Sequence, residues 1–527
     1  MEGFAVVLAV LLLAVAVLNA LASRVGIPYP IVLVVGGLAL GVLSGMPEVE
    51  MEPELVLLVF LPPLLYVAAF FADVRSLRSY ARALTLTSIG LVLFTMVAVA
   101  VVGHHLLDLP WPMAFVLGAV VSPTDPVAAT AIMRRLGAPR RIVDLVEGES
   151  LVNDAAALVG YRVALAAAVG GAFSLAEATG EFLLAAGGGV ALGLVVGYVV
   201  GEIRRRLDDT LTEITISLTT GYLAFIPAEE LHLSGVLAVV TAGLYLGWRS
   251  PDLASPTTRL QAFAVWDVTT FLCNATLFVL IGLQLPVVVE ALDGQALTEL
   301  MGYAALVTAA VVGSRFLWLF SVPYLIRALD RRPRQRELRV GAAARAVVAW
   351  SGLRGAVSLA TALALPIETD AGEALPGRDL IVFVTFAVVL VTVVGQGLTL
   401  PVLVRRFGLA SEGPDDEEAR EELHARLAAS KAALAELEVM AEEGWAADEA
   451  LARSREYYVE RKRRHAARAG KIEDDGYEDR SQLRQRVLRR LWSAERQAII
   501  GERNAGVISN EVMHRLVREL DLEESYL

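Results

Sequence analysis

Apolar blocks, each about twenty residues long, recur along this chain from Phe4 to Val404 and limit its possible folds severely. A helix of about twenty apolar residues is long enough to cross the hydrocarbon core of a bilayer. The segments between the blocks are short, whereas a soluble chain of this length would show amphipathic helices. The pattern predicts an all-α polytopic membrane protein that is surrounded by membrane lipid.

Thirteen spans can be placed on this pattern. They cover residues 3–23, 29–45, 53–72, 83–107, 111–133, 142–170, 176–206, 212–229, 233–248, 259–292, 300–328, 341–366 and 378–405. The thirteen can be divided into six, one linker and six, so that the second six has inverted topology. The fifth and twelfth spans are both interrupted, at SPTDP and WSGLRGA. Inverted repeats with interrupted, crossing helices are typical of secondary transporters.

Arginine is distributed unevenly over the loops and predicts the orientation of the chain. Arginines cluster in alternate loops, among them 75–82, 134–141, 204–206 and 327–339, whereas the intervening loops hold almost none. We expect a multi-pass protein of the plasma membrane. Because cytoplasmic loops carry the excess of Lys and Arg, its N-terminus is predicted outside the cell and its C-terminus in the cytoplasm.

The last part of the chain has a different composition. Residues 1–408 are predicted to form the transmembrane domain, and residues 409–527, rich in Glu, Arg and Ala, a helical cytosolic tail. The tail could be a solvated helical surface, a dimer contact or a site for a regulatory partner. The net charge of −12 is concentrated in the tail and one set of loops, and no nucleic-acid partner is expected. The single cysteine, Cys273, excludes a disulfide framework and a Cys-based metal site.

A few polar side chains fall inside the spans, where a charge costs roughly 2.5–3.5 kcal/mol or more and therefore needs a partner or a function. Two of these residues are Arg315 and Arg354. At about 100° per residue, the polar residues of the sixth span share one helix face that must point inward. The polar residues are Thr124 and Asp125 in the fifth span, and Glu149, Ser150, Asn153 and Asp154 in the sixth.

Asp154 and Asp125 are expected at similar depth, near the middle of the membrane, where they can share one cavity. Pro126 predicts an unwound fifth span, whose freed carbonyls and Thr124 hydroxyl suit a small monovalent cation. Asp125 could serve the site or only cap the following half-helix. Because a desolvated carboxylate holds a proton until a cation replaces it, the two ions compete for Asp154. Asn153 leaves only one obvious exchanging carboxylate, which favours electroneutral exchange.

Two arginines remain to be paired. We expect Glu149 to stay ionised beside Arg354, as a structural pair or as a contributor to ion selection. Arg315 is left as the partner of some unassigned acidic group.

At these residues the sequence resembles the monovalent cation:proton antiporter family of the CPA1 type, which includes bacterial and animal sodium/proton exchangers. The resemblance spans residues 1 to about 405 and is carried by FLPPLLYVAAF, SPTDPVAATAI, EGESLVNDAAALV and GLRGAVSLA. It implies a cation bound by Thr124, Ser150 and Asp154, with support from Asn153 and Asp125. It also implies a Glu149–Arg354 pair and a homodimer with elevator-like alternating access. Val67 stands where many relatives have an acidic residue, which bears on the choice between Na⁺ and K⁺.

The sequence therefore predicts a secondary antiporter that exchanges Na⁺ for H⁺, with K⁺ or Li⁺ as alternative cargo, no cofactor, and a role in pH and sodium homeostasis. A K⁺-selective antiporter, an ion channel or a symporter on the same architecture stays open. An intramembrane hydrolase with an Asp125–Asp154 dyad is disfavoured by the context of Asn153, Arg354 and the paired repeats. No GxSxG, HExxH or nucleotide loop offers another catalytic centre.

Overall fold

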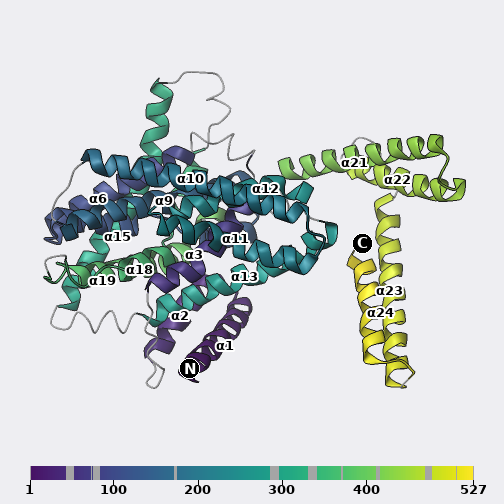
Figure 1. Cartoon of the computed structure of the whole chain (residues 1–527), viewed down its shortest axis with the longest axis horizontal. Coiled ribbons are helices and arrows are strands. Elements are labelled where there is room, and N and C mark those ends of the chain that lie inside the picture. Colours follow the sequence, from purple (N-terminus) through teal and green to yellow (C-terminus); the bar gives the residue numbers. More distant parts are fainter. Residues whose placement is uncertain are drawn as a thin grey trace. The chain divides into compact units, whose positions relative to one another are not determined.

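A computed structural model of the chain describes residues 2–42, 53–72, 74, 84–170, 175–253, 255–284, 296–329, 341–369, 372–410, 416–468, 477–505 and 507–525. These residues are almost entirely helical, apart from one isolated β-bridge between Glu368 and Ala374. The chain divides into two compact units, Met1–Gly413 and Pro414–Leu527, and each is described by itself (Figure 1).

The first unit is a bundle of apolar helices. Its elements are α1 (Glu2–Val25), α2 (Tyr29–Val42), α3 (Pro53–Phe70), the π-helix η1 (Leu86–Gly90), α6 (Leu91–Leu106), α7 (Trp111–Val121), α8 (Pro126–Arg135), α9 (Arg140–Gly170), α10 (Leu175–Arg205), α11 (Thr210–Glu230), α12 (Gly235–Leu253), α13 (Pro256–Leu283), α15 (Leu297–Leu329), α17 (Ala342–Trp350), α18 (Ala356–Leu363), α19 (Arg378–Leu390), the π-helix η2 (Val391–Gln396) and α20 (Gly397–Arg406).

Each predicted span falls on helix, and the all-α membrane fold is confirmed. Among the described residues, seven helices are long and apolar enough to cross a membrane, and three shorter apolar helices lie at Ala9–Val25, Tyr29–Val42 and Leu58–Phe70. The number of thirteen crossings remains a prediction. The predicted tenth span, 259–292, corresponds to α13, which ends at Leu283, and residues 285–295 lie outside the described part of the chain.

The two predicted interruptions are present. The fifth span stops at Val121 and resumes at Pro126, because proline lacks the amide that a continuous helix needs and is well suited to the first position of a new one. The twelfth span stops at Trp350 and resumes at Ala356, after a segment that contains Gly352 and Gly355. Each interruption leaves backbone amides and carbonyls free inside the bundle, where they must find other partners.

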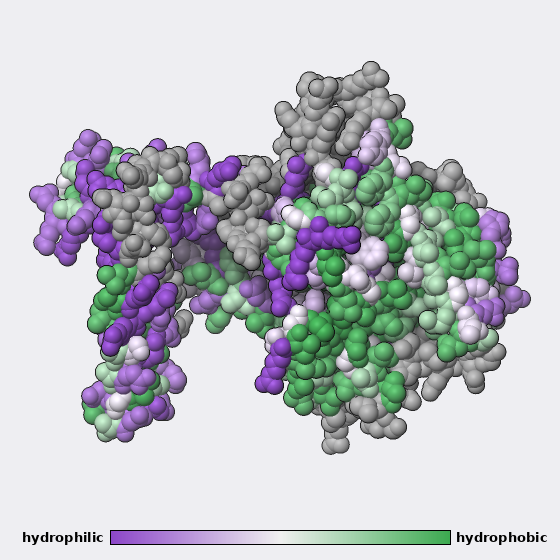
Figure 2. All heavy atoms as spheres, turned by 180° about the vertical axis from the view of Figure 1, so that it is seen from behind, coloured by the Kyte–Doolittle hydropathy of each residue, from purple (hydrophilic) through white to green (hydrophobic). Residues whose placement is uncertain are grey.

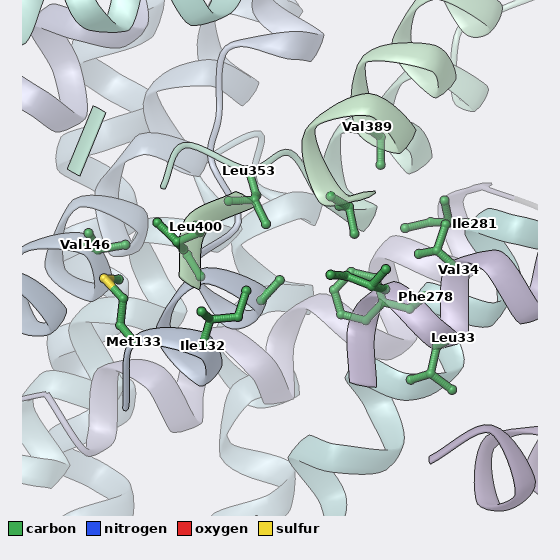
Figure 3. Packing of buried hydrophobic residues seen from close by; sticks show 14 of the residues in the cluster. Leu33, Val34, Ile132, Met133, Val146, Phe278, Ile281, Leu353, Val389 and Leu400 are labelled. Atoms are coloured by element: carbon green, nitrogen blue, oxygen red, sulfur yellow. The ribbon is translucent and has the colours of Figure 1, made fainter. Parts of the chain in front are cut away.

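A large apolar cluster surrounds these interruptions (Figure 3). Leu353, from the gap in the twelfth span, is fully buried and packs in the same cluster as Ile132 of α8, Phe278 of α13 and Leu400 of α20. The outer surface of the unit is also widely apolar in the face that Figure 2 shows. Large apolar side chains such as Leu184 of α10 are exposed, as in a protein solvated by lipid.

The second unit consists of four helices: α21 (Asp416–Glu443), α22 (Asp448–Arg468), α23 (Tyr477–Asn504) and α24 (Asn510–Ser525). Helices α21 and α22 pack as one antiparallel hairpin, and α23 and α24 pack as another. In the second hairpin, Arg496 of α23 binds Asp521 and Glu524 of α24. The surface of this unit is mostly hydrophilic (Figure 2), so its composition differs from that of the bundle.

Candidate ion-binding site

The two interruptions lie against each other and are joined by two hydrogen bonds. The Asp125 amide donates to the Leu353 carbonyl at 2.8 Å. The Arg354 Nε donates to the Val121 carbonyl at 2.7 Å. Two backbone carbonyls that the broken helices leave unpaired thus find donors across the crossing, one a backbone amide and the other an arginine side chain, as buried polar groups must.

Asp125 caps α8, as the sequence predicts. Its side chain accepts a hydrogen bond from the Val127 amide at 2.9 Å, and its backbone is extended, as in an N-cap residue. Asp125 therefore has a structural role, and its contribution to ion binding remains a prediction.

Two glycines of the twelfth span make room for charged side chains. A Cβ atom on Gly355 would lie 2.0 Å from Asp125 Oδ2, and one on Gly352 would lie 2.5 Å from Arg315 Cδ. Both distances are far below van der Waals contact, so only glycine admits these side chains without a shift. The glycines of WSGLRGA therefore do more than interrupt their own span, because they also leave space for side chains of neighbouring spans.

The polar face of α9 is buried, as predicted from its spacing. Glu149, Ser150, Asn153 and Asp154 are all less than 9% exposed. Asn153 Nδ2 donates to Thr124 Oγ1 at 2.8 Å, and this hydroxyl lies 3.4 Å from Glu149 Oε1, to which it donates. These bonds fix Thr124, in the gap of the fifth span, against the middle of α9. The Asn153 Oδ1 atom is buried and has no partner among the described residues.

Asp154 differs from its neighbours because no described residue donates a hydrogen bond to its carboxylate. It is 8% exposed. A buried carboxylate without a protein partner is costly while it is ionised. The role of Asp154 in holding a proton or a cation remains a prediction.

Glu149 pairs with Arg315, so the predicted pairing with Arg354 was wrong. Arg315 Nη1 and Nη2 bind the two Glu149 oxygens at 2.5 and 3.1 Å, and both side chains are almost fully buried. Arg354 instead donates to backbone carbonyls, those of Val121 and Gly352. The reason is geometric: freed carbonyls of the crossing lie within reach of Arg354, whereas α15 presents Arg315 to the Glu149 side of α9.

Two hydroxyls that the sequence analysis did not single out belong to this network, and both lie in π-helical turns. Ser88 of η1 donates to the Glu149 carbonyl at 2.9 Å. Thr392 Oγ1 of η2 accepts a hydrogen bond from the Arg354 amide at 3.1 Å. Serine and threonine are common in apolar helices, so the sequence does not mark these two as contacts of the site, whereas π-helical turns are frequent at functional sites.

Comparison with known proteins gives a consistent result. The profile of the family described as "Sodium/hydrogen exchanger, transmembrane" matches residues 8–406. An uncharacterized Na⁺/H⁺ exchanger of Mycobacterium tuberculosis is 37% identical over 526 residues, which cover 99% of this chain and 96% of that protein. A Na⁺/H⁺ antiporter of Aphanothece halophytica is 34% identical over 78% of this chain and 76% of its own length.

Two further similarities bear on cargo and on fold. A protein of Bacillus pumilus named as a sodium, potassium, lithium and rubidium/H⁺ antiporter is 32% identical over 72% of this chain and 58% of its own length. The structure of the sodium proton antiporter of Methanocaldococcus jannaschii at pH 8 superposes with a TM-score of 0.58 and 20% identity. It covers 78% of this chain and 100% of that one, so the fold is shared.

Proposed function

The chain belongs to the sodium/hydrogen exchanger family, and from this premise we propose that it exchanges Na⁺ for H⁺ by competition of the two ions for the Asp154 carboxylate. As a member of this family it is a multi-pass membrane antiporter and not an enzyme. The proposal concerns the residue that carries the ions, the stoichiometry and the cargo.

The observation that carries the proposal is the contrast between Asp154 and the polar groups around it. Glu149 forms a bidentate ion pair with Arg315, and Asn153 donates a hydrogen bond to Thr124. No described residue donates a hydrogen bond to the Asp154 carboxylate. A bound proton or cation would supply the positive partner that the protein does not give the Asp154 carboxylate. Because a bare carboxylate in the membrane is costly, Asp154 crosses between the two sides only when it is occupied.

The ligands of the cation follow from the same geometry. We assign Asp154, Thr124 and Ser150 as the cation ligands, with Asn153 holding Thr124 and Asp125 closing the site from the gap of the fifth span. Glu149 is neutralised by Arg315 and Asp125 accepts a hydrogen bond from the Val127 amide, which leaves Asp154 as the carboxylate that changes occupant. One proton for one monovalent cation is an electroneutral exchange.

The identity of the cargo is supported by the relatives, whose names include Na⁺ in each case and K⁺, Li⁺ and Rb⁺ in the Bacillus protein. We take Na⁺ as the main cargo. Val67 is buried and apolar at the position where the resemblance leads one to expect an acid, so it adds no ligand. A series of Na⁺, Li⁺, K⁺ and Rb⁺ gradients in proteoliposomes would rank the ions.

The remaining expectations are part of the same proposal. We propose that the N-terminus lies outside and the C-terminal unit in the cytoplasm, because the arginine-rich loops favour the cytoplasmic side. A homodimer with alternating access would let the bundle around Asp154 move while the dimer contact stays fixed. The tail unit would then be free to bind a regulatory partner.

The decisive experiment is Asp154→Asn in proteoliposomes, with proton movement driven by an inward or outward Na⁺ gradient. Asparagine has no proton to exchange, so Na⁺/H⁺ exchange should fall below a hundredth of the wild-type rate. The matched control is Asp144→Asn on the same helix, because Asp144 is partly exposed and forms an ion pair with Arg140 at 3.9 Å. Exchange that persists in Asp154→Asn would refute the proposal.

A further inference from the structure

Thr392 lies in the π-helical turn η2, is fully buried and bridges two spans. Its hydroxyl donates to the Val388 carbonyl of its own helix at 2.8 Å, and its oxygen accepts the Arg354 amide at 3.1 Å. The hydroxyl therefore joins the thirteenth span to the interruption of the twelfth.

The Arg354 amide needs this partner. It lies between Trp350, the last residue of α17, and Ala356, the first of α18, so no helical carbonyl is in register to receive it. Arg354 is 1% exposed, and a buried amide without an acceptor is destabilising. Within the described part of the chain, the Thr392 oxygen is the acceptor that it finds.

Two hydrogen bonds connect the backbone around Arg354 to the fifth span. Arg354 Nε donates to the Val121 carbonyl at the end of α7, and the preceding Leu353 carbonyl accepts from the Asp125 amide at 2.8 Å. Thr124 lies between these two anchored points of the fifth span. A shift of the Arg354 backbone would therefore move Thr124 and Asp125 together.

We propose that Thr392 is a positioning residue for the transported cation, which sets the Thr124 hydroxyl against Asp154 by fixing the crossing of the two interrupted spans. The inference rests on the proposed role of Asp154. The π-helical turn is part of the arrangement, because Thr392 lies within it and its oxygen accepts the hydrogen bond of the Arg354 amide.

The chain offers a closely matched control for this residue. Thr385 lies two turns earlier on α19, is also fully buried, and has a hydroxyl without a hydrogen-bond partner among the described residues. Thr392→Val and Thr385→Val make the same chemical change in one span, but only the first removes a bond to the crossing. Thr392→Ser keeps the hydroxyl and serves as the rescue.

The measurement is Na⁺-driven exchange in proteoliposomes, with KM for Na⁺, maximal rate and pH profile determined separately. Thr392→Val should raise KM by about 5- to 30-fold, the range that corresponds to one lost buried hydrogen bond. At a fixed, low Na⁺ concentration its half-maximal exchange should move to higher pH, because protons displace a weakly held cation more easily. Thr385→Val and Thr392→Ser should stay within about 2-fold of wild-type KM.

A merely structural role would lower the maximal rate through loss of folded protein and leave KM and the pH profile unchanged, which would overturn the inference. Equal KM values for Thr392→Val and Thr385→Val would overturn it as well. If valine at 392 prevents folding, Thr392→Ala removes the hydroxyl without added bulk and should show the same rise in KM. Asp154→Asn distinguishes the role of Asp154 from the role of Thr392. If Asp154→Asn loses exchange while Thr392→Val keeps the wild-type KM, only the positioning role of Thr392 is refuted.

Discussion

Glu149 and Asp154 lie five residues apart on one helix, are both buried, and have different surroundings. Arg315 forms a bidentate pair with Glu149, whereas Asp154 receives no hydrogen bond from the described residues. Paired hydrogen bonds between an arginine and a carboxylate are strong and geometrically specific. The pairing therefore distinguishes a carboxylate that has a protein counter-charge from one that has none among the described residues.

The pairing of Glu149 can be tested with double-mutant cycles. In Glu149→Gln and Arg315→Met the remaining partner loses its counter-charge, so each single change should lower the free energy of unfolding by about 3–5 kcal/mol. The double variant should recover part of this loss, with a coupling of about 2 kcal/mol or more. The measurement is chemical unfolding of the purified protein in detergent.

The control cycle combines Glu149→Gln with Arg354→Met. Because Arg354 donates to backbone carbonyls, its coupling to Glu149 should be under about 1 kcal/mol. A coupling with Arg354 that exceeds the coupling with Arg315 would restore the pairing that the sequence suggests.

At the scale of elements, the crossing of two broken spans is built from proline, glycine and the backbone. Pro126 ends one helix and starts the next, and Gly355 lets the Asp125 carboxylate approach the other span closely. The interruptions could be predicted from SPTDP and WSGLRGA, because proline and glycine act locally. The hydrogen bonds between them could not, since they join residues more than two hundred positions apart.

Gly355→Ala tests this close approach. The added methyl would lie 2.0 Å from Asp125 Oδ2 and 2.5 Å from its Cβ, so Asp125 must move. We expect a loss of stability of about 1–3 kcal/mol and a drop of more than tenfold in Na⁺/H⁺ exchange. Exchange in proteoliposomes and thermal unfolding in detergent would be measured together.

Gly313→Ala is the matched control, since apart from the local backbone of α15 no atom of the described residues lies within 4 Å of the added methyl. It should leave exchange and stability close to wild type. Equal behaviour of the two variants would show that Asp125 does not need the space that Gly355 provides.

On the scale of the whole molecule, the chain consists of two separately packed units with different surfaces. The bundle, Met1–Gly413, has a widely apolar surface and buries many polar groups, whereas the tail unit, Pro414–Leu527, has a mostly polar surface and a small core (Figure 2). That core includes His465 of α22, which is 1% exposed and has no hydrogen-bond partner among the described residues for either ring nitrogen.

The tail unit should lose stability in acid independently of the bundle. Burial, and after it the charges of Arg464, Arg426, Arg461 and Arg468, lower the pKa of His465 to about 4. In the unfolded chain the pKa is about 6.5. Between these values the unfolded state binds more protons, so stability falls as pH drops from about 6.5 to about 4, by roughly 3 kcal/mol in total.

Amide hydrogen-exchange protection factors of α21 and α22, corrected for the intrinsic rate at each pH, would measure this fall. His465→Leu should remove the pH dependence, and His424→Leu, at an exposed position of α21, should keep it. A tail whose protection is the same at pH 7 and pH 4.5 would contradict the prediction.

The sequence by itself determined the membrane-spanning helical class, the places where two spans break, and the polar face of α9 with Asp154 on it. Hydrophobic length, proline and glycine, and helical periodicity are local properties, so they can be read along the chain. Only the tertiary structure decided that Arg315 and not Arg354 neutralises Glu149, and that Thr392 holds the crossing. Those contacts depend on how distant spans pack and rotate against one another, and a buried charge or amide binds whichever partner that packing brings within reach.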